Sequence, residues 1–185
     1  MRLPCPAIMR QQESTMTDTI TFRRAVYAVE LIHDEDAGKP WEREDGHGPV
    51  SDWTTRDKRP GELVLCADRR AKRYYDFQQA TADAKRDSWG LGPDDMALLV
   101  KRLGRPATRG EIVRQAVLDD FERLQRWCDD AWHYVGVVVT RLDAHGNRLE
   151  HLQASLWGIE SDAGDYLDTV ARELIREIEA MRAAA

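Results

Sequence analysis

The chain has 185 residues, of which 42% are apolar and 32% charged, and its formal net charge is −6 at pH 7. These values are typical of a soluble globular protein with a core of its own. They argue against a strongly basic nucleic-acid-binding protein, although a local basic patch stays compatible with them. No apolar run approaches the ~18 residues of a membrane span. The widely spaced Cys5, Cys66 and Cys128 fit neither a disulfide framework nor a zinc site, so we expect reduced cysteines in a cytoplasmic protein.

The N-terminal residues show no usable periodicity and lack the apolar segment of a secretory signal. Met16-Thr-Asp reads like a second translation start. We therefore expect residues 1–16 to form a disordered or extended tail, and residues 17–185 to form a single α+β domain.

Strands are predicted in the first half of the chain. The segment Ile20 to His33 carries apolar residues on both faces, which predicts one long strand inside a sheet. Two shorter strands are predicted over residues 62–66 and 72–75, joined by a turn at Asp68-Arg69-Arg70.

Helices are predicted from capping residues and apolar spacing. Asp76 opens a helix that extends to about residue 88, and residues 94–103 form a second helix that Gly104 ends. A capping box at Thr108 and Glu111 opens a third helix that extends to about residue 132. The last helix, residues 162–183, is expected to be capped by Ser161 or Asp162.

The segment 133–159 predicts a C-terminal β-hairpin, because two extended runs flank His145-Gly146. With the turn centred there, an apolar face forms from the pairs Val139–Leu152, Val137–Ala154 and Val135–Leu156. Arg141 then lies opposite Glu150, and Tyr134 lies opposite Trp157.

The predicted fold is therefore an α+β domain. Its antiparallel sheet contains the Ile20 strand, the Glu62 region and the C-terminal hairpin. The helices 109–132 and 162–183 are expected to cover one face of this sheet.

A long polar loop, residues 34–61, contains the main candidate binding surface. Its first part, residues 34–52, holds seven acidic and two basic side chains, whereas residues 56–73 hold seven basic and three acidic ones. Exposed aromatic residues beside charges are typical of binding hot spots, while the alternative is that the tryptophans pin the loop onto the body. The candidate residues are Trp41, Glu44, Asp45, His47, Trp53, Arg56, Lys58 and Arg59.

Catalytic and cofactor motifs are not found in the sequence. It contains no HExxH, no GxSxG and no glycine-rich phosphate loop. We therefore expect no cofactor, no metal and a protein that is not an enzyme. An enzyme or metal site formed by the acidic and histidine residues of the 42–47 loop is the alternative.

Two resemblances bear on function. The segment 93–124, through KRLGR at 101–105 and RGEIVRQA at 109–116, resembles the two helices of ribbon-helix-helix DNA-binding proteins, although SWGLG replaces the strand that precedes them. This resemblance implies a DNA-binding surface made of Lys101, Arg102, Arg105, Arg109 and Arg114.

The second resemblance spans most of the chain from Ile20. The runs DGHGPVSDWTTRDKRPGELVL, DDAWHYVGVVVTRLD and SLWGIESDAGDYLDTVARELI look like small uncharacterised accessory proteins of tailed phages and prophages. The resemblance implies a phage accessory protein in the cytoplasm of a bacterial host. We expect it to bind a protein or other macromolecule of the host or phage, one form of which is inhibition of a host defence system or enzyme. Nucleic acid is a further candidate partner, and a membrane is not expected.

Overall fold

The computed structural model describes residues 16–184. In chain order, its elements are β1 (Met16–Phe22), β2 (Ala25–His33), α1 (Pro40–Arg43), β3 (Glu62–Ala67), β4 (Lys72–Asp76), α2 (Phe77–Arg86), α3 (Pro93–Leu103), α4 (Arg109–Cys128), β5 (Tyr134–Leu142), β6 (Arg148–Glu160) and α5 (Asp165–Ala184). The predicted α+β class is confirmed, as are the antiparallel sheet and its C-terminal hairpin. Within residues 16–184, no helix combines the length and apolar character that a bilayer crossing requires. The predicted tail falls outside the described residues except for Met16, which starts β1.

The described residues, 16–184, divide into two compact units. We call residues 16–37 and 133–184 the terminal unit, and residues 38–132 the inserted unit. The inserted unit lies in the sequence between β2 and β5, which are neighbouring strands of the terminal unit. Each unit therefore has to form its own core.

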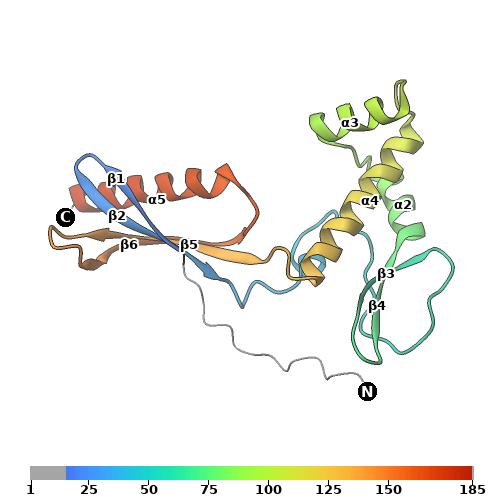
Figure 1. Ribbon diagram of the computed structural model, residues 1–185, viewed down its shortest axis with the longest axis horizontal. Helices are drawn as coiled ribbons and strands as arrows, with labels where there is room; N and C mark the ends of the chain where they lie inside the picture. Colours follow the sequence, from blue (N-terminus) through green and yellow to red (C-terminus); the bar gives the residue numbers. More distant parts are fainter. Residues whose placement is uncertain (1–15, 185) are drawn as a thin grey trace, which may run out of the picture. The chain divides into compact units, whose positions relative to one another are not determined.

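The terminal unit is an antiparallel sheet with one helix packed on it. The strand order is β1-β2-β5-β6, and α5 lies along one face, packed against β5 and β6 (Figure 1). The core between them contains Tyr27 of β2, the valines of β5 and the apolar stripe of α5, which includes Val170, Leu174 and Ile178. This stripe repeats at three and four residues, as a helix packed on a sheet requires.

The predicted Ile20–His33 strand is two strands rather than one. Arg23 and Arg24 have φ angles of 47° and 68°, and between them β1 turns back to pair with β2. Two consecutive positive φ angles are typical of a tight hairpin turn, which usually contains Asn or Gly. Since neither residue is present here, the sequence pattern did not reveal the turn. The predicted central position is confirmed for β2, which lies between β1 and β5.

The C-terminal hairpin has the predicted face but a different register. Val139 pairs with Ala154 and Val137 pairs with Leu156, two residues further along β6 than predicted. Irregularities between Thr140 and Leu142, and again between Val135 and Val137, add extra residues to β6. A shift of two residues keeps Leu152 and Ala154 on the predicted face, because the side-chain period of a strand is two. The third predicted pair is wrong by three residues: Val135 pairs with Ile159, which is buried, whereas Leu156 is 44% exposed.

The charged partners of the hairpin also differ from the prediction. Arg141 does not pair with Glu150 but reaches Glu179 of α5, 3.1 Å away, and Tyr27 donates a 2.7 Å hydrogen bond to the same carboxylate. Burial, together with Glu179, raises the pKa of Tyr27 to about 12. This partly buried cluster fixes α5 on the sheet.

The sheet face opposite α5 carries a tightly seated tryptophan. A side chain at Gly136 would lie 2.4 Å from the ring of Trp157, so only glycine leaves room for the indole there. On the same face, Glu30 is buried and accepts two 2.6 Å hydrogen bonds from Arg148. Trp157 therefore packs against Gly136 and not opposite Tyr134, which pairs with Glu160.

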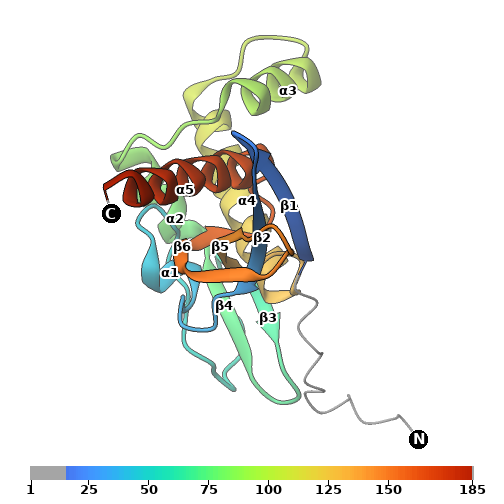
Figure 2. The same cartoon turned by 90° about the vertical axis from the view of Figure 1, so that its left-hand side faces the viewer.

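The inserted unit is built on a small antiparallel ribbon, the pair β3–β4, drawn in green in Figure 2. These two strands are confirmed, but they form their own sheet and do not join the hairpin sheet as predicted. The helix α4 was also predicted to cover the hairpin sheet. It packs instead against α2 and β3, where its buried stripe of Val113, Val117 and Leu124 completes the core of this unit. The strand and helix signals were local, whereas the choice of packing partner is not.

The helix ends follow their capping residues. Asp76 accepts a hydrogen bond from the backbone of Gln79, and Thr108 and Glu111 form the predicted capping box. The helix α4 ends at Cys128, earlier than predicted, and Asp130 beyond it has a φ of 56°. The helix α5 starts at Asp165, after a turn over the predicted caps.

Candidate functional site

The polar loop before β3 is not a free loop. Its middle part follows the outer edge of β4 as an additional extended segment. Four backbone hydrogen bonds of 2.8–2.9 Å join the two, through Pro49, Ser51 and Thr54 on the loop and Lys72, Tyr74 and Asp76 on β4. The backbone of the candidate surface is therefore held in place before any partner binds.

A largely buried carboxylate, Asp120 of α4, holds the start of this loop. Its Oδ1 lies 2.5 Å from His47 Nδ1, and its Oδ2 accepts hydrogen bonds from the Gly48 amide at 2.8 Å and the Tyr75 hydroxyl at 2.6 Å. Gly48 is required here, because a Cβ would lie 2.3 Å from the Tyr75 hydroxyl. The carboxylate therefore joins the loop, β4 and α4.

The charges of this network favour a protonated histidine. Burial opposes the charged imidazole, but the hydrogen bond and negative charge of Asp120 outweigh burial and raise the pKa of His47. Burial, with the same carboxylate, also raises the pKa of Tyr75 far above its usual value. Tyr75 thus stays a neutral donor, and the network behaves as an ion pair with two further donors.

The position of His47 argues for a structural role. A histidine paired with a carboxylate is a common general base, and the 42–47 loop was the alternative candidate for an enzyme or metal site. However, His47 Nε2 is buried with no hydrogen-bond partner in the described part of the chain, and Glu44 lies 3.7 Å from it. Asp45 is exposed. Within residues 16–184, no three His, Cys, Asp or Glu side chains gather closely enough to hold a metal ion.

Both candidate tryptophans lie against one buried arginine. The guanidinium of Arg73 lies 5.1 Å from the ring centre of Trp41 and 4.9 Å from that of Trp53. Trp41 also packs edge-on against Trp127, and it is partly buried. Trp53 remains 46% exposed, while Arg73 beneath it is only 6% exposed. Trp41 thus pins the loop and Trp53 faces solvent.

The basic candidate residues also divide into one that holds the loop and two that are exposed to solvent. Arg56 makes a two-pronged ion pair with Glu62, at 2.7 and 2.5 Å, and stacks over Tyr74. The hydrogen bonds from Arg56 lower the pKa of Glu62 to about 2. Lys58 and Arg59 are exposed, and their side chains have no ion-pair partner within residues 16–184. The same is true of Arg69, Arg70 and Lys72 on and beside the β3–β4 turn.

The structure thus brings together only part of the predicted site. Trp53, Lys58 and Arg59 are available to a partner, whereas Trp41, His47 and Arg56 hold the loop. Asp120, Arg73 and Tyr75 were missed. The sequence does indicate that Asp120 faces the core, because it lies at helical spacing between the buried residues Val117 and Leu124 of α4.

The alternative nucleic-acid surface is largely occupied by internal contacts. Arg102 donates a 2.6 Å hydrogen bond to Gln115, Arg105 pairs with Glu111, and Arg114 lies over Phe77. Among the predicted cations, Lys101 and Arg109 have no such partner in the described residues. Residues 88–92, where ribbon-helix-helix proteins have their DNA-reading strand, form no strand.

Comparison of the chain with protein-family models, with curated proteins and with solved structures gave no match.

Proposed function

We propose that this chain is a non-enzymatic binding protein that docks on an acidic surface of another macromolecule through Trp53 and the basic side chains near it. The observation that carries the proposal is the exposure of Trp53 on a backbone that is already fixed. A pre-ordered loop loses little conformational entropy on binding, so the contact area of the indole contributes to affinity.

The chemistry around Trp53 supports this role. Tryptophan and arginine are the residues most enriched in binding hot spots, and the indole of Trp53 lies on the guanidinium of Arg73. The buried arginine holds the ring in one orientation by cation–π attraction. Because one face of the Trp53 ring lies on Arg73, the other face is presented to a partner.

The charges favour an acidic partner. Lys58, Arg59 and Lys72 are exposed without ion-pair partners in the described part of the chain, although the whole protein is negative. Over residues 56–73 the exposed basic side chains outnumber the exposed acidic ones, and such an excess attracts and orients an acidic surface. The negative remainder of the protein disfavours adsorption to polyanions in general.

The partner is proposed to be a host or phage protein in the bacterial cytoplasm. The support for this part is the resemblance of three runs to phage accessory proteins. One of these runs includes Trp53, Lys58 and Arg59. Inhibition of a host defence system or enzyme is the specific form that we propose for this binding.

The test is capture of partners from phage-infected cells by the immobilised full chain, with quantitative mass spectrometry. We expect Trp53→Ala and the charge reversal Lys58→Glu/Arg59→Glu to lose the captured protein. The matched control is Trp157→Ala, since Trp157 is 47% exposed but lies in the terminal unit. Circular dichroism must show that each variant is folded.

Two results would contradict the proposal. One is equal capture by Trp53→Ala and the parent chain. The other is loss of all captured material after nuclease treatment, which would identify a nucleic-acid partner in place of an acidic protein.

A further inference from the structure

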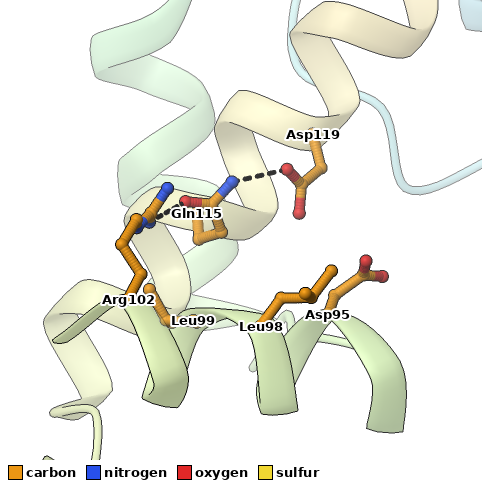
Figure 3. A pocket seen from close by; sticks show the side chains of 6 residues that line it. All are labelled: Asp95, Leu98, Leu99, Arg102, Gln115 and Asp119. Atoms are coloured by element: carbon orange, nitrogen blue, oxygen red, sulfur yellow. Dashed lines mark hydrogen bonds between the residues drawn. The ribbon is translucent and has the colours of Figure 1, made fainter. Parts of the chain in front are cut away.

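The helix α3 carries an unusually exposed apolar side chain. Leu98 is 63% exposed, the highest value among the large apolar side chains in the described residues, whereas its neighbour Leu99 is buried. Beside Leu98, a groove of about 370 Å³ separates α3 from α4, as Figure 3 shows. Its lining residues are Asp95, Leu98, Leu99, Arg102, Gln115 and Asp119.

The two ends of the groove carry opposite charges. Asp95 of α3 and Asp119 of α4 lie at one end, and Arg102 lies at the other (Figure 3). Arg102 donates one hydrogen bond to Gln115, which in turn donates a 2.6 Å hydrogen bond to Asp119. A guanidinium has five donors, so most of those of Arg102 remain available. Asp95 has no hydrogen bond or ion pair within residues 16–184.

The spacing of these charges makes the helix complementary to itself. Asp95 and Arg102 are seven residues apart, which is two helical turns or roughly 10 Å along the axis, and both lie on the same stripe as Leu98. The midpoint of the pair falls between Leu98 and Leu99. A two-fold axis through that point would place Asp95 of one helix opposite Arg102 of the other, twice.

We propose that α3 pairs antiparallel with α3 of a second copy of this chain. Leu98 of each copy enters the groove of the other and covers Leu99. Arg102 of each copy reaches the acidic end of the facing groove, between the carboxylates of Asp95 and Asp119. Such an interface uses the same patch on both copies, as two-fold symmetric dimers do.

The charge pattern favours a second copy over a foreign segment. A purely basic ligand would meet Arg102, and a purely acidic one would meet Asp95 and Asp119. An occupant needs both signs at a two-turn separation with an apolar residue between them, and α3 itself has this pattern. One pair of 11-residue helices buries less than the ~1,200–2,000 Å² of a stable interface, so the dimer is weak and forms at high concentration.

Sedimentation equilibrium of the full chain from roughly 10 μM to 1 mM tests the proposal, in the affinity range of small interfaces. The parent chain should show a monomer–dimer equilibrium. Asp95→Arg and Arg102→Glu should each weaken it at least about ten-fold, because each creates two repulsive contacts in place of two attractive ones. Asp94→Arg is the control, since it makes the same change in the same helical turn outside the groove.

The decisive experiment mixes the Asp95→Arg variant with the Arg102→Glu variant. The new guanidinium at position 95 would then face the new carboxylate at position 102, so the mixture should form heterodimers at about the parental affinity. The double variant should regain homodimers. A parent chain that is monomeric throughout, or a dimer whose affinity does not follow these exchanges, would overturn the proposal.

Discussion

Asp120 offers the sharpest test of how the candidate loop is held. Its carboxylate accepts from Gly48 and Tyr75 and pairs with His47. Asp120→Ala removes the acceptor that His47, Gly48 and Tyr75 share, and it leaves their donor groups unpaired inside the protein. Breaking a buried charged network in this way costs about 3–5 kcal/mol, less than the sum of its separate hydrogen bonds at ~1.5–3 kcal/mol each, because such contributions are not additive.

Urea unfolding followed by tryptophan fluorescence measures this loss. With a denaturant slope of about 2 kcal/mol per molar, the midpoint should fall by about 1.5–2.5 M. Glu122→Ala is the matched control, because it removes an exposed carboxylate from the same helix. An exposed change of this kind stays within about 0.5 kcal/mol. Equal urea midpoints for Asp120→Ala and Glu122→Ala would refute the role of Asp120 in holding the loop.

The pH dependence of stability gives the same test a second readout. Because Asp120 raises the pKa of His47 in the folded state, the ion pair contributes fully below the unfolded value near 6.5. Its contribution is lost as the pH rises through the folded pKa. The free energy of unfolding should therefore fall above about pH 6.5 in the parent chain, and this slope should shrink in Asp120→Asn. An unchanged slope would show that another group titrates.

Three further changes test the rest of the fold. Gly136→Ala should destabilise the terminal unit by about 1–3 kcal/mol, because its Cβ would lie 2.4 Å from Trp157; adding Trp157→Ala should recover part of that loss in urea unfolding, and no recovery would contradict the close packing. Arg23→Asn with Arg24→Gly should raise the free energy of unfolding by about 0.5–1 kcal/mol, since relief of the positive φ angles exceeds the entropy cost of glycine. The hydrogen-bonded guanidinium of Arg56 lowers the pKa of Glu62 to about 2. The stabilisation from this ion pair is therefore present above the unfolded pKa of about 4.5 and is lost as the pH falls through the folded pKa. Glu62→Gln should reduce the loss of unfolding free energy at acid pH, and an equally steep loss would count against the ion pair.

The sequence was informative wherever the signal was local. The capping box at Thr108, the cap at Asp76 and the stop at Gly104 place helix ends because they act within one turn. The alternation along β5 predicts which of its residues face α5, and the two-residue register error keeps Ala154 on that face, although Ile159 is buried there in place of the predicted Leu156.

The signal failed where the structure depends on distant partners or on strained turns. The Arg23–Arg24 turn carries no Asn or Gly, and the irregularities in β6 have no clear sequence mark apart from Gly158, whose φ is 79°. Both short strands were identified, yet nothing local shows that β3 and β4 form a separate ribbon with α4 as its cover.

The candidate site shows the same limit. The sequence marked Trp41 and Trp53 as equivalent residues of one polar loop. Trp41 packs against Trp127 and is partly buried, whereas Trp53 contacts the buried Arg73 and stays exposed, and only the folded structure shows this difference. Similarly, Asp120 reads as one acidic residue of a charged helix until its partners are placed around it.

Fluorine NMR of the chain labelled with 5-fluorotryptophan shows whether Trp53 is the residue that docks on the partner. The chain has six tryptophans, whose resonances are assigned by substituting them one at a time. On addition of the captured partner, the Trp53 resonance should shift or broaden while that of Trp157 stays unchanged. A shift of Trp157 with no change at Trp53 would contradict this role of Trp53.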